Sequence, residues 1–170
     1  YYAAFRLPDL VFNTLILGAL SAAFVPVFLE YWHRDRKEAW RIANTVLNST
    51  LLILFIFGLA AFIWAPEVVK IIAPGFGLEK RLATAELTRI MLVGILFLGL
   101  SNVASSILNA FKRFTAFAVA PVMYNLGIIG GIIFLVPMFG VQGLAWGVVL
   151  GAFLHFLVQK QLEFYELLFQ

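Results

Sequence analysis

The longest stretch of this sequence without a charged side chain covers residues 114–159, and it constrains the fold more than any other feature. As a single helix, these 46 residues would be about 69 Å long, more than twice the roughly 30 Å hydrocarbon core of a bilayer. The run must therefore fold back on itself. Pro137, Gly140 and Gly143 cluster near its middle, and they predict a turn between two helices.

Three further charge-free runs cover residues 10–29, 43–64 and 90–111, each long enough to cross the hydrocarbon core once. The composition indicates the same environment, because only 12% of the 170 residues are charged, against about 25% in an average soluble domain. We therefore expect an all-α fold, a polytopic membrane bundle of about five transmembrane helices that forms one membrane domain over residues 1–170. The expected helices cover residues 3–31, 38–72, 82–112, 115–136 and 142–168.

Basic residues concentrate in the first and third connections between these helices. The first, residues 31–41, holds four Lys and Arg together with Trp32 and Trp40, and the third is the pair Lys112 and Arg113. By parity the two connections lie on one side of the membrane, and the positive-inside rule predicts that this side is cytoplasmic. The second connection mixes acidic and basic residues, which favours an amphipathic segment at the interface.

Glycines recur at helical spacing in the last two expected helices. In the final helix they lie four residues apart, a spacing that lets helix backbones approach closely. We expect these residues to serve helix packing rather than substrate contact. The glycines concerned are Gly127, Gly130, Gly131, Gly143, Gly147 and Gly151.

Arg6, Asp9 and Asn13 form a polar stripe in the first expected helix. A charge at the bilayer centre costs about 2.5–3.5 kcal/mol on insertion scales, so these residues should be paired, interfacial or facing water. Their spacing of three and four residues puts them on one helix face, where Arg6 and Asp9 can form a salt bridge. The stripe is either a surface pair at the membrane boundary or the lining of a cavity, and its three residues are our candidate substrate-binding residues.

The remaining polar residues predict no enzyme. No paired carboxylates lie near the membrane core, and the sequence has no glycine-rich phosphate loop and no serine in a nucleophile elbow. There are no cysteines, and His155 has no second ligand at metal-binding spacing. We therefore expect no catalytic residue, no metal site and no cofactor. The basic residues between the apolar runs indicate contact with membrane lipids, and nothing in the sequence indicates binding to nucleic acid.

Six motifs in order along the chain resemble those of a known family. They are AFRLPDL at 4–10, GALSAAFVP at 18–26, APGF at 73–76, ILNAFKRF at 107–114, APVMYNL at 120–126 and GLAWGVVLG at 143–151. Together they resemble the MurJ (MviN) family, the lipid II flippases of the multidrug/oligosaccharidyl-lipid/polysaccharide exporter superfamily. The resemblance implies a fragment that corresponds to the second to sixth helices of a fourteen-helix transporter, and hence a partial N-terminal lobe of a two-lobed protein.

By this resemblance, the transporter flips lipid II, a peptidoglycan precursor on an undecaprenyl diphosphate carrier, across the bacterial inner (cytoplasmic) membrane by alternating access. Its partners are then this lipid-linked substrate, the membrane lipids and the missing remainder of the transporter. The family has an essential arginine and, five residues later, an acid at positions that here read Phe12 and Leu17. This departure leaves open a drug or polysaccharide exporter of the same superfamily. A second alternative is a non-transporting membrane scaffold or remnant, because five helices cannot form two lobes.

Overall fold

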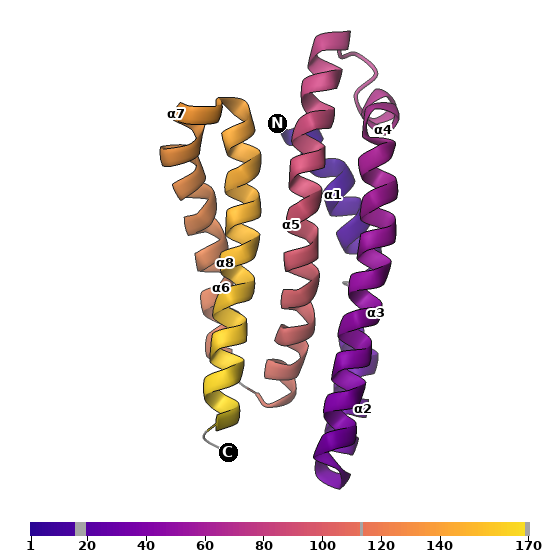
Figure 1. Cartoon of the computed structure of the whole chain (residues 1–170), viewed down its shortest axis with the longest axis vertical. Helices are drawn as coiled ribbons and strands as arrows, with labels where there is room; N and C mark the ends of the chain where they lie inside the picture. The colour runs from indigo at the N-terminus through magenta and orange to yellow at the C-terminus, as the bar shows by residue number, and fades with distance from the viewer. Residues whose placement is uncertain (16–19, 113, 169–170) are drawn as a thin grey trace.

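The computed structural model describes the backbone of residues 1–15, 20–112 and 114–168, and the side chains of residues 1–13, 23–112 and 118–161. Every element in this part is helical, which confirms the all-α fold (Figure 1). In chain order the elements are α1 (Tyr2–Leu15), α2 (Leu20–Arg34), α3 (Arg36–Ile63), α4 (Ala65–Ile72), α5 (Leu78–Ala110), α6 (Phe114–Gly130), the π-helical η1 (Gly131–Leu135), α7 (Val136–Phe139) and α8 (Val141–Leu168).

Four stretches of helix in the described part are long and apolar enough to cross a membrane: Arg36–Ile63, Leu78–Ala110, Ala118–Phe139 and Val141–Gln161. The first expected helix, residues 3–31, falls on α1 and α2, which lie on either side of residues 16–19. Those four residues lie outside the described part of the chain. The protein is thus a multi-pass membrane bundle.

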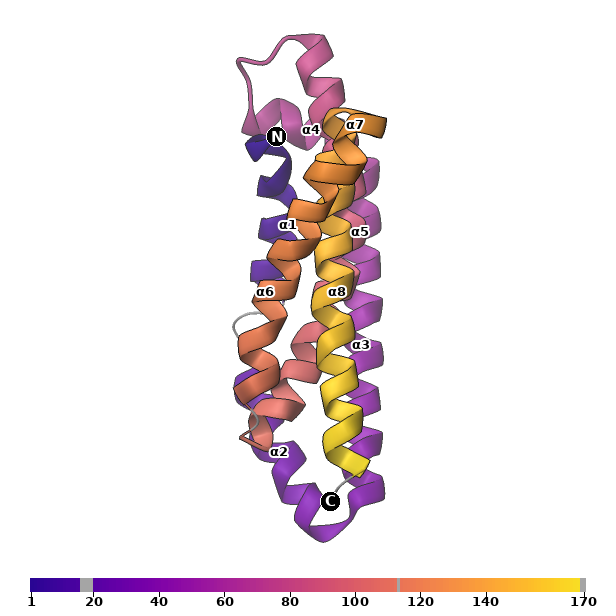
Figure 2. The same cartoon turned by 90° about the vertical axis from the view of Figure 1, so that its left-hand side faces the viewer.

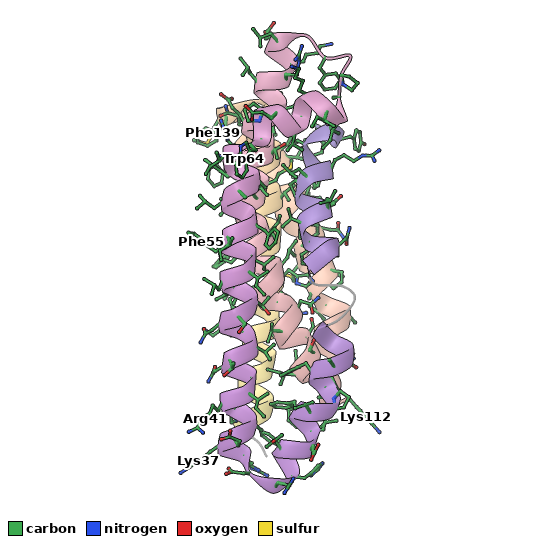
Figure 3. All side chains as sticks on the ribbon, turned by 90° about the vertical axis from the view of Figure 1, so that its right-hand side faces the viewer. Lys37, Arg41, Phe55, Trp64, Lys112 and Phe139 are labelled. Atoms are coloured by element: carbon green, nitrogen blue, oxygen red, sulfur yellow. The ribbon has the colours of Figure 1, made fainter. Side chains whose placement is uncertain are left out.

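Helix α5 is the centre of the bundle and packs against both of its halves. Figures 1 and 2 show α1, α2 and α3 on one side of it and the pair α6 and α8 on the other. Leu92 and Ile95 pack with Leu7 and Leu54. Met91 belongs to a second cluster, which includes Ala145 and Val148 of α8. The outer face of the bundle is apolar. Phe55 of α3, for example, is 57% exposed and points away from the neighbouring helices (Figure 3), an arrangement that suits lipid.

The glycines of α8 form a close contact with α6 and η1, which confirms the packing role expected from their spacing. Gly147 faces Gly131, and Gly151 faces Gly127, so closely that a Cβ on these glycines would meet backbone atoms of the opposite helix. Gly130 differs, because a Cβ there would meet no atom within 4 Å. The prediction that Gly130 shares in this contact was therefore wrong: the residue faces away from α8.

The long apolar run reverses at Gly140, as expected, and the helix before it is distorted. Pro137 has no N–H to donate, and its ring crowds the carbonyl four residues earlier. The preceding turn widens in response into the π-helix η1, in which Val136 N donates to the carbonyl of Gly131, five residues back. Gly140 then adopts a φ of 58°, a conformation that favours glycine.

An aromatic cluster closes the end of the bundle at which α2 meets α3. The rings of Trp32 and Trp40 lie 6.2 Å apart, and Phe111 at the end of α5 lies 4.9 Å from Trp32. The Arg36 guanidinium lies over the Trp32 ring at 5.0 Å from its centroid. Figure 3 shows Lys37, Arg41 and Lys112 at this end, opposite the end that carries α4.

These positions allow a direct test of orientation, because the positive-inside rule predicts that the basic end faces the cytoplasm. Cysteines at Arg36 and Lys112 should be shielded from an impermeant thiol reagent in intact cells, whereas a cysteine at Gly77, which is exposed at the opposite end, should react. Arg113 lies outside the described residues, so Lys112 represents the third connection. If the cysteines at positions 36 and 112 are labelled and the cysteine at position 77 is protected, the protein has the opposite orientation to the predicted one.

Candidate functional site

A groove with a volume of about 570 Å³ opens between α1, α5, α6 and α8. Most of its exposed surface is apolar, but eight of its eleven described lining residues carry a polar side chain. This is unusual in a bundle whose other faces are apolar, because polar groups in a membrane are retained where they meet water, one another or a substrate. The described lining residues are Asp9, Phe12, Asn13, Leu98, Asn102, Ser105, Ser106, Asn109, Pro121, Tyr124 and His155.

Helical periodicity places the polar residues of α5 on this groove. Asn102, Ser105 and Asn109 follow one another at intervals of three and four residues, so their side chains share one face of the helix. The opposite wall repeats the pattern, because Asp9 and Asn13 are four residues apart on α1. Two polar stripes on different helices therefore face one cavity.

A buried hydrogen-bond network behind the groove fixes α5 against α8. His155 Nδ1 lies 2.5 Å from Ser101 Oγ, and Gln159 Nε2 donates to Ser105 Oγ at 2.5 Å. Ser101 Oγ in turn donates to Gln159 Oε1. Gln159 is only 1% exposed, so its amide needs these partners. The network holds Ser105 and His155 in place at the groove wall.

The direction of these bonds determines the tautomer of the neutral His155 ring. Ser101 has a single hydroxyl hydrogen, which it donates to Gln159. The hydrogen of the His155–Ser101 contact must then be on His155 Nδ1. In the neutral ring this leaves Nε2 as an acceptor. His155 is half-buried and its ring makes an edge contact with Tyr124, with the centroids 6.4 Å apart.

The three candidate residues from the sequence do not all reach the groove. Asp9 and Asn13 line it, whereas the exposed Arg6 is not among the lining residues. In the described part of the chain the ion pairs are Arg34–Glu30 and Arg41–Glu38, so Arg6 and Asp9 do not form the expected salt bridge. The helix spacing placed the two charges on adjacent turns, but the groove meets only one of them.

Phe12 and Leu17 are the two positions at which the sequence departs from the pattern that the resemblance implies, and the structure describes only the first of them. Phe12 lines the groove, so the substitution changes the cavity itself. Leu17 lies outside the described residues. Sequence reasoning also missed Ser105, Ser106 and Tyr124, although the interval pattern of polar residues on α5 was a usable signal for the two serines.

The described lining residues carry little charge, and the charge that they carry is negative, which does not favour binding of an anion. Asp9 is the acid of this lining and His155 its imidazole, and no Lys or Arg is present among the described lining residues. The rest of the polar lining consists of amides, hydroxyls and one phenol. Such a wall can form many neutral hydrogen bonds but supplies little to offset a negatively charged ligand.

Comparison with known proteins agrees with this architecture. The family model described as lipid II flippase MurJ matches residues 1–165. A lipid II flippase MurJ of Burkholderia cenocepacia is 35% identical over 167 residues, which cover 94% of this chain and 32% of the relative. A probable lipid II flippase MurJ of Buchnera aphidicola subsp. Baizongia pistaciae is 32% identical, with the same shares covered.

A shorter match joins these two. A probable lipid II flippase MurJ of Rickettsia prowazekii is 32% identical over 128 residues, which cover 74% of this chain and 25% of that protein. The chain thus spans about a third of the length of the curated relatives it matches. Since the family match covers nearly the whole chain, this protein belongs to the lipid II flippase MurJ family.

Proposed function

We propose that this chain forms part of one lobe of a flippase that moves lipid II across a bacterial inner membrane by alternating access. The observation that supports this most directly is the polar groove, which opens between α1, α5, α6 and α8 of an otherwise apolar bundle. A groove of this kind, at the junction of several helices, is where membrane transporters hold a polar substrate. Its role would be to form one wall of the transport cavity.

The proposed transporter has two lobes, and its partners follow from this arrangement. A second lobe would close the groove from the open side, and the two lobes together would alternate in access to the two sides of the membrane. The substrate would be a lipid-linked oligosaccharide on an undecaprenyl diphosphate carrier, with its chain in the bilayer. Asp9 and Asn13 line the groove and remain our candidates for substrate contact, whereas Arg6, the third candidate, lies outside it.

One observation favours a second candidate, an exporter of a drug or polysaccharide from the same superfamily. The described lining has no lysine or arginine, and Phe12 lies where the family resemblance implies an arginine. A substrate without a diphosphate would need no such cation. We rank this second because a second lobe can supply the missing positive charge.

The test is a flipping assay with the complete two-lobed transporter in proteoliposomes. Fluorescent lipid II in the inner leaflet should become accessible to a membrane-impermeant quencher only when the transporter is present. A drug or an unlinked polysaccharide at excess should not compete. Movement of a labelled drug or polysaccharide across the same membrane, together with no lipid II movement, would favour the exporter. No movement of any of them would support a scaffold.

Arg6→Ala in the same assay should slow lipid II flipping by less than about twofold. Arg6 is exposed and outside the groove, and its neighbour Asp9 offsets part of its field. Removal of arginines from the second lobe, or from the transporter helix that precedes this chain, should slow flipping far more. Those arginines would offset the negative charge of the diphosphate. Arg41→Ala, at the basic end, is the matched control. Complete loss of flipping in Arg6→Ala, with normal insertion, would place the binding charge in this lobe.

A further inference from the structure

We infer that the groove between α1, α5, α6 and α8 receives the uncharged, hydroxyl-rich sugar portion of the lipid-linked substrate, and that the diphosphate is held elsewhere in the transporter. This inference rests on the proposed flippase function and assigns the groove to one part of that substrate. Three features of the described residues support it: the charge of the wall, the balance of its donors and acceptors, and its aromatic side chains.

The charge of the wall argues against a diphosphate in the groove. Two phosphate groups bring at least two negative charges, and in a partly desolvated cavity these need fixed cations. The described lining residues supply no fixed cation, and the Asp9 carboxylate would repel the phosphate groups. Sugar rings carry no charge there, so the same wall costs them nothing in electrostatic repulsion.

The hydrogen-bonding groups of the wall match hydroxyls better than phosphates. An ionised phosphate only accepts hydrogen bonds, whereas a sugar hydroxyl both donates and accepts. Asp9 accepts only, and the neutral ring of His155, a lining residue, keeps Nε2 as an acceptor when Nδ1 donates to Ser101. Asn13 and Asn109 can do both. A wall that mixes acceptors with amides therefore serves a ligand that offers O–H donors.

The groove also has the shape and rigidity that a sugar needs. Its volume of about 570 Å³ lies within the roughly 300–1,000 Å³ range of small-molecule sites. Phe12 and Tyr124 place aromatic rings at the wall, which can cover the apolar C–H faces of sugar rings. Ser105 is held by Gln159 and His155 by Ser101, so part of the polar surface is fixed before a ligand arrives.

The experiment measures binding of two lipids to the complete transporter in nanodiscs: a polyprenyl diphosphate, and the same lipid carrying an N-acetylated disaccharide. The unaltered protein should bind the disaccharide form more tightly. Asn13→Leu and Asn109→Leu, on opposite walls, should each weaken binding of the disaccharide form about fivefold to tenfold, the effect of one or two hydrogen bonds. Binding of the sugar-free lipid should change by less than about twofold.

The matched control is Asn48→Leu, an asparagine on α3 that is exposed and outside the groove, which should leave both affinities unchanged. Equal losses for both lipids in the groove variants, or no loss for either, would overturn the assignment to sugar. Asn109→Ser replaces the amide with a hydroxyl, which can still donate and accept a hydrogen bond, and should restore most of the affinity that Asn109→Leu loses. This variant separates a lost contact from a folding defect. If the unaltered protein binds neither lipid, the proposed function itself fails.

Discussion

Gly147→Leu should lower the midpoint of thermal unfolding in detergent by roughly 5–10 °C. A Cβ at Gly147 would lie 3.0 Å from the Cα of Gly131 and 3.3 Å from the carbonyl oxygen of Ile128, and both are backbone atoms that cannot rotate away. Overpacking of this kind costs about 1–3 kcal/mol, and a domain of this size loses about 2–4 °C for each kcal/mol. The helices α6 and α8 must therefore separate to admit the side chain.

Gly130→Leu is the control for this measurement, because it makes the same chemical change where a Cβ would meet no atom within 4 Å. Its unfolding midpoint should stay within about 2 °C of the unaltered protein, since surface changes away from packed contacts are usually small. Equal losses in Gly147→Leu and Gly130→Leu would show that leucine harms this region in general. An unchanged midpoint in Gly147→Leu would show that α6 and α8 do not pack through these glycines.

Much of the fold could be predicted because local sequence determines it directly. Charge-free length predicts membrane helices, and the Pro137–Gly140 pair predicts the reversal between the last two. Glycine spacing predicted a close contact, but spacing alone could not show which glycines of α6 and η1 take part. Gly130 and Gly131 are neighbours in sequence, yet only Gly131 meets Gly147. That choice depends on how α6 is rotated against α8, which requires both helices at once.

The candidate site was predicted in part for a related reason. Asp9 and Asn13 were found because a polar or charged side chain in a membrane helix is costly and therefore informative. The sequence could not show that Arg6, one turn earlier, misses the groove. It also could not show that Ser101, Ser105, His155 and Gln159 form one network, because this depends on the register of α5 against α8. Ser101 and Ser105 are four residues apart on α5, and His155 and Gln159 are four residues apart on α8. This spacing places each pair on one face of its helix but does not show that the two faces meet.

The groove offers a change whose effect on charge recognition should be large. Phe12→Arg places a guanidinium at a lining position that now carries an aromatic ring. We expect affinity for a sugar-free polyprenyl diphosphate to rise roughly tenfold to a hundredfold, because a charge-assisted hydrogen bond contributes about 1.5–3 kcal/mol. The gain should shrink as ionic strength rises, and the preference for the disaccharide form should fall.

Two further variants determine whether charge is the cause of that gain. Phe12→Leu removes the same aromatic ring without adding a cation, so affinity for the polyprenyl diphosphate should not rise. Asp9→Asn combined with Phe12→Arg should raise it further, because Asp9 lies three residues away on the same helix and its carboxylate would offset the new cation. Binding of both lipids to the complete transporter, measured at low and high salt, checks each expectation. If Phe12→Arg folds normally but leaves the affinity for the polyprenyl diphosphate unchanged, the diphosphate does not reach the groove even when no sugar occupies it. The charge of this wall then does not determine which part of the substrate the groove receives.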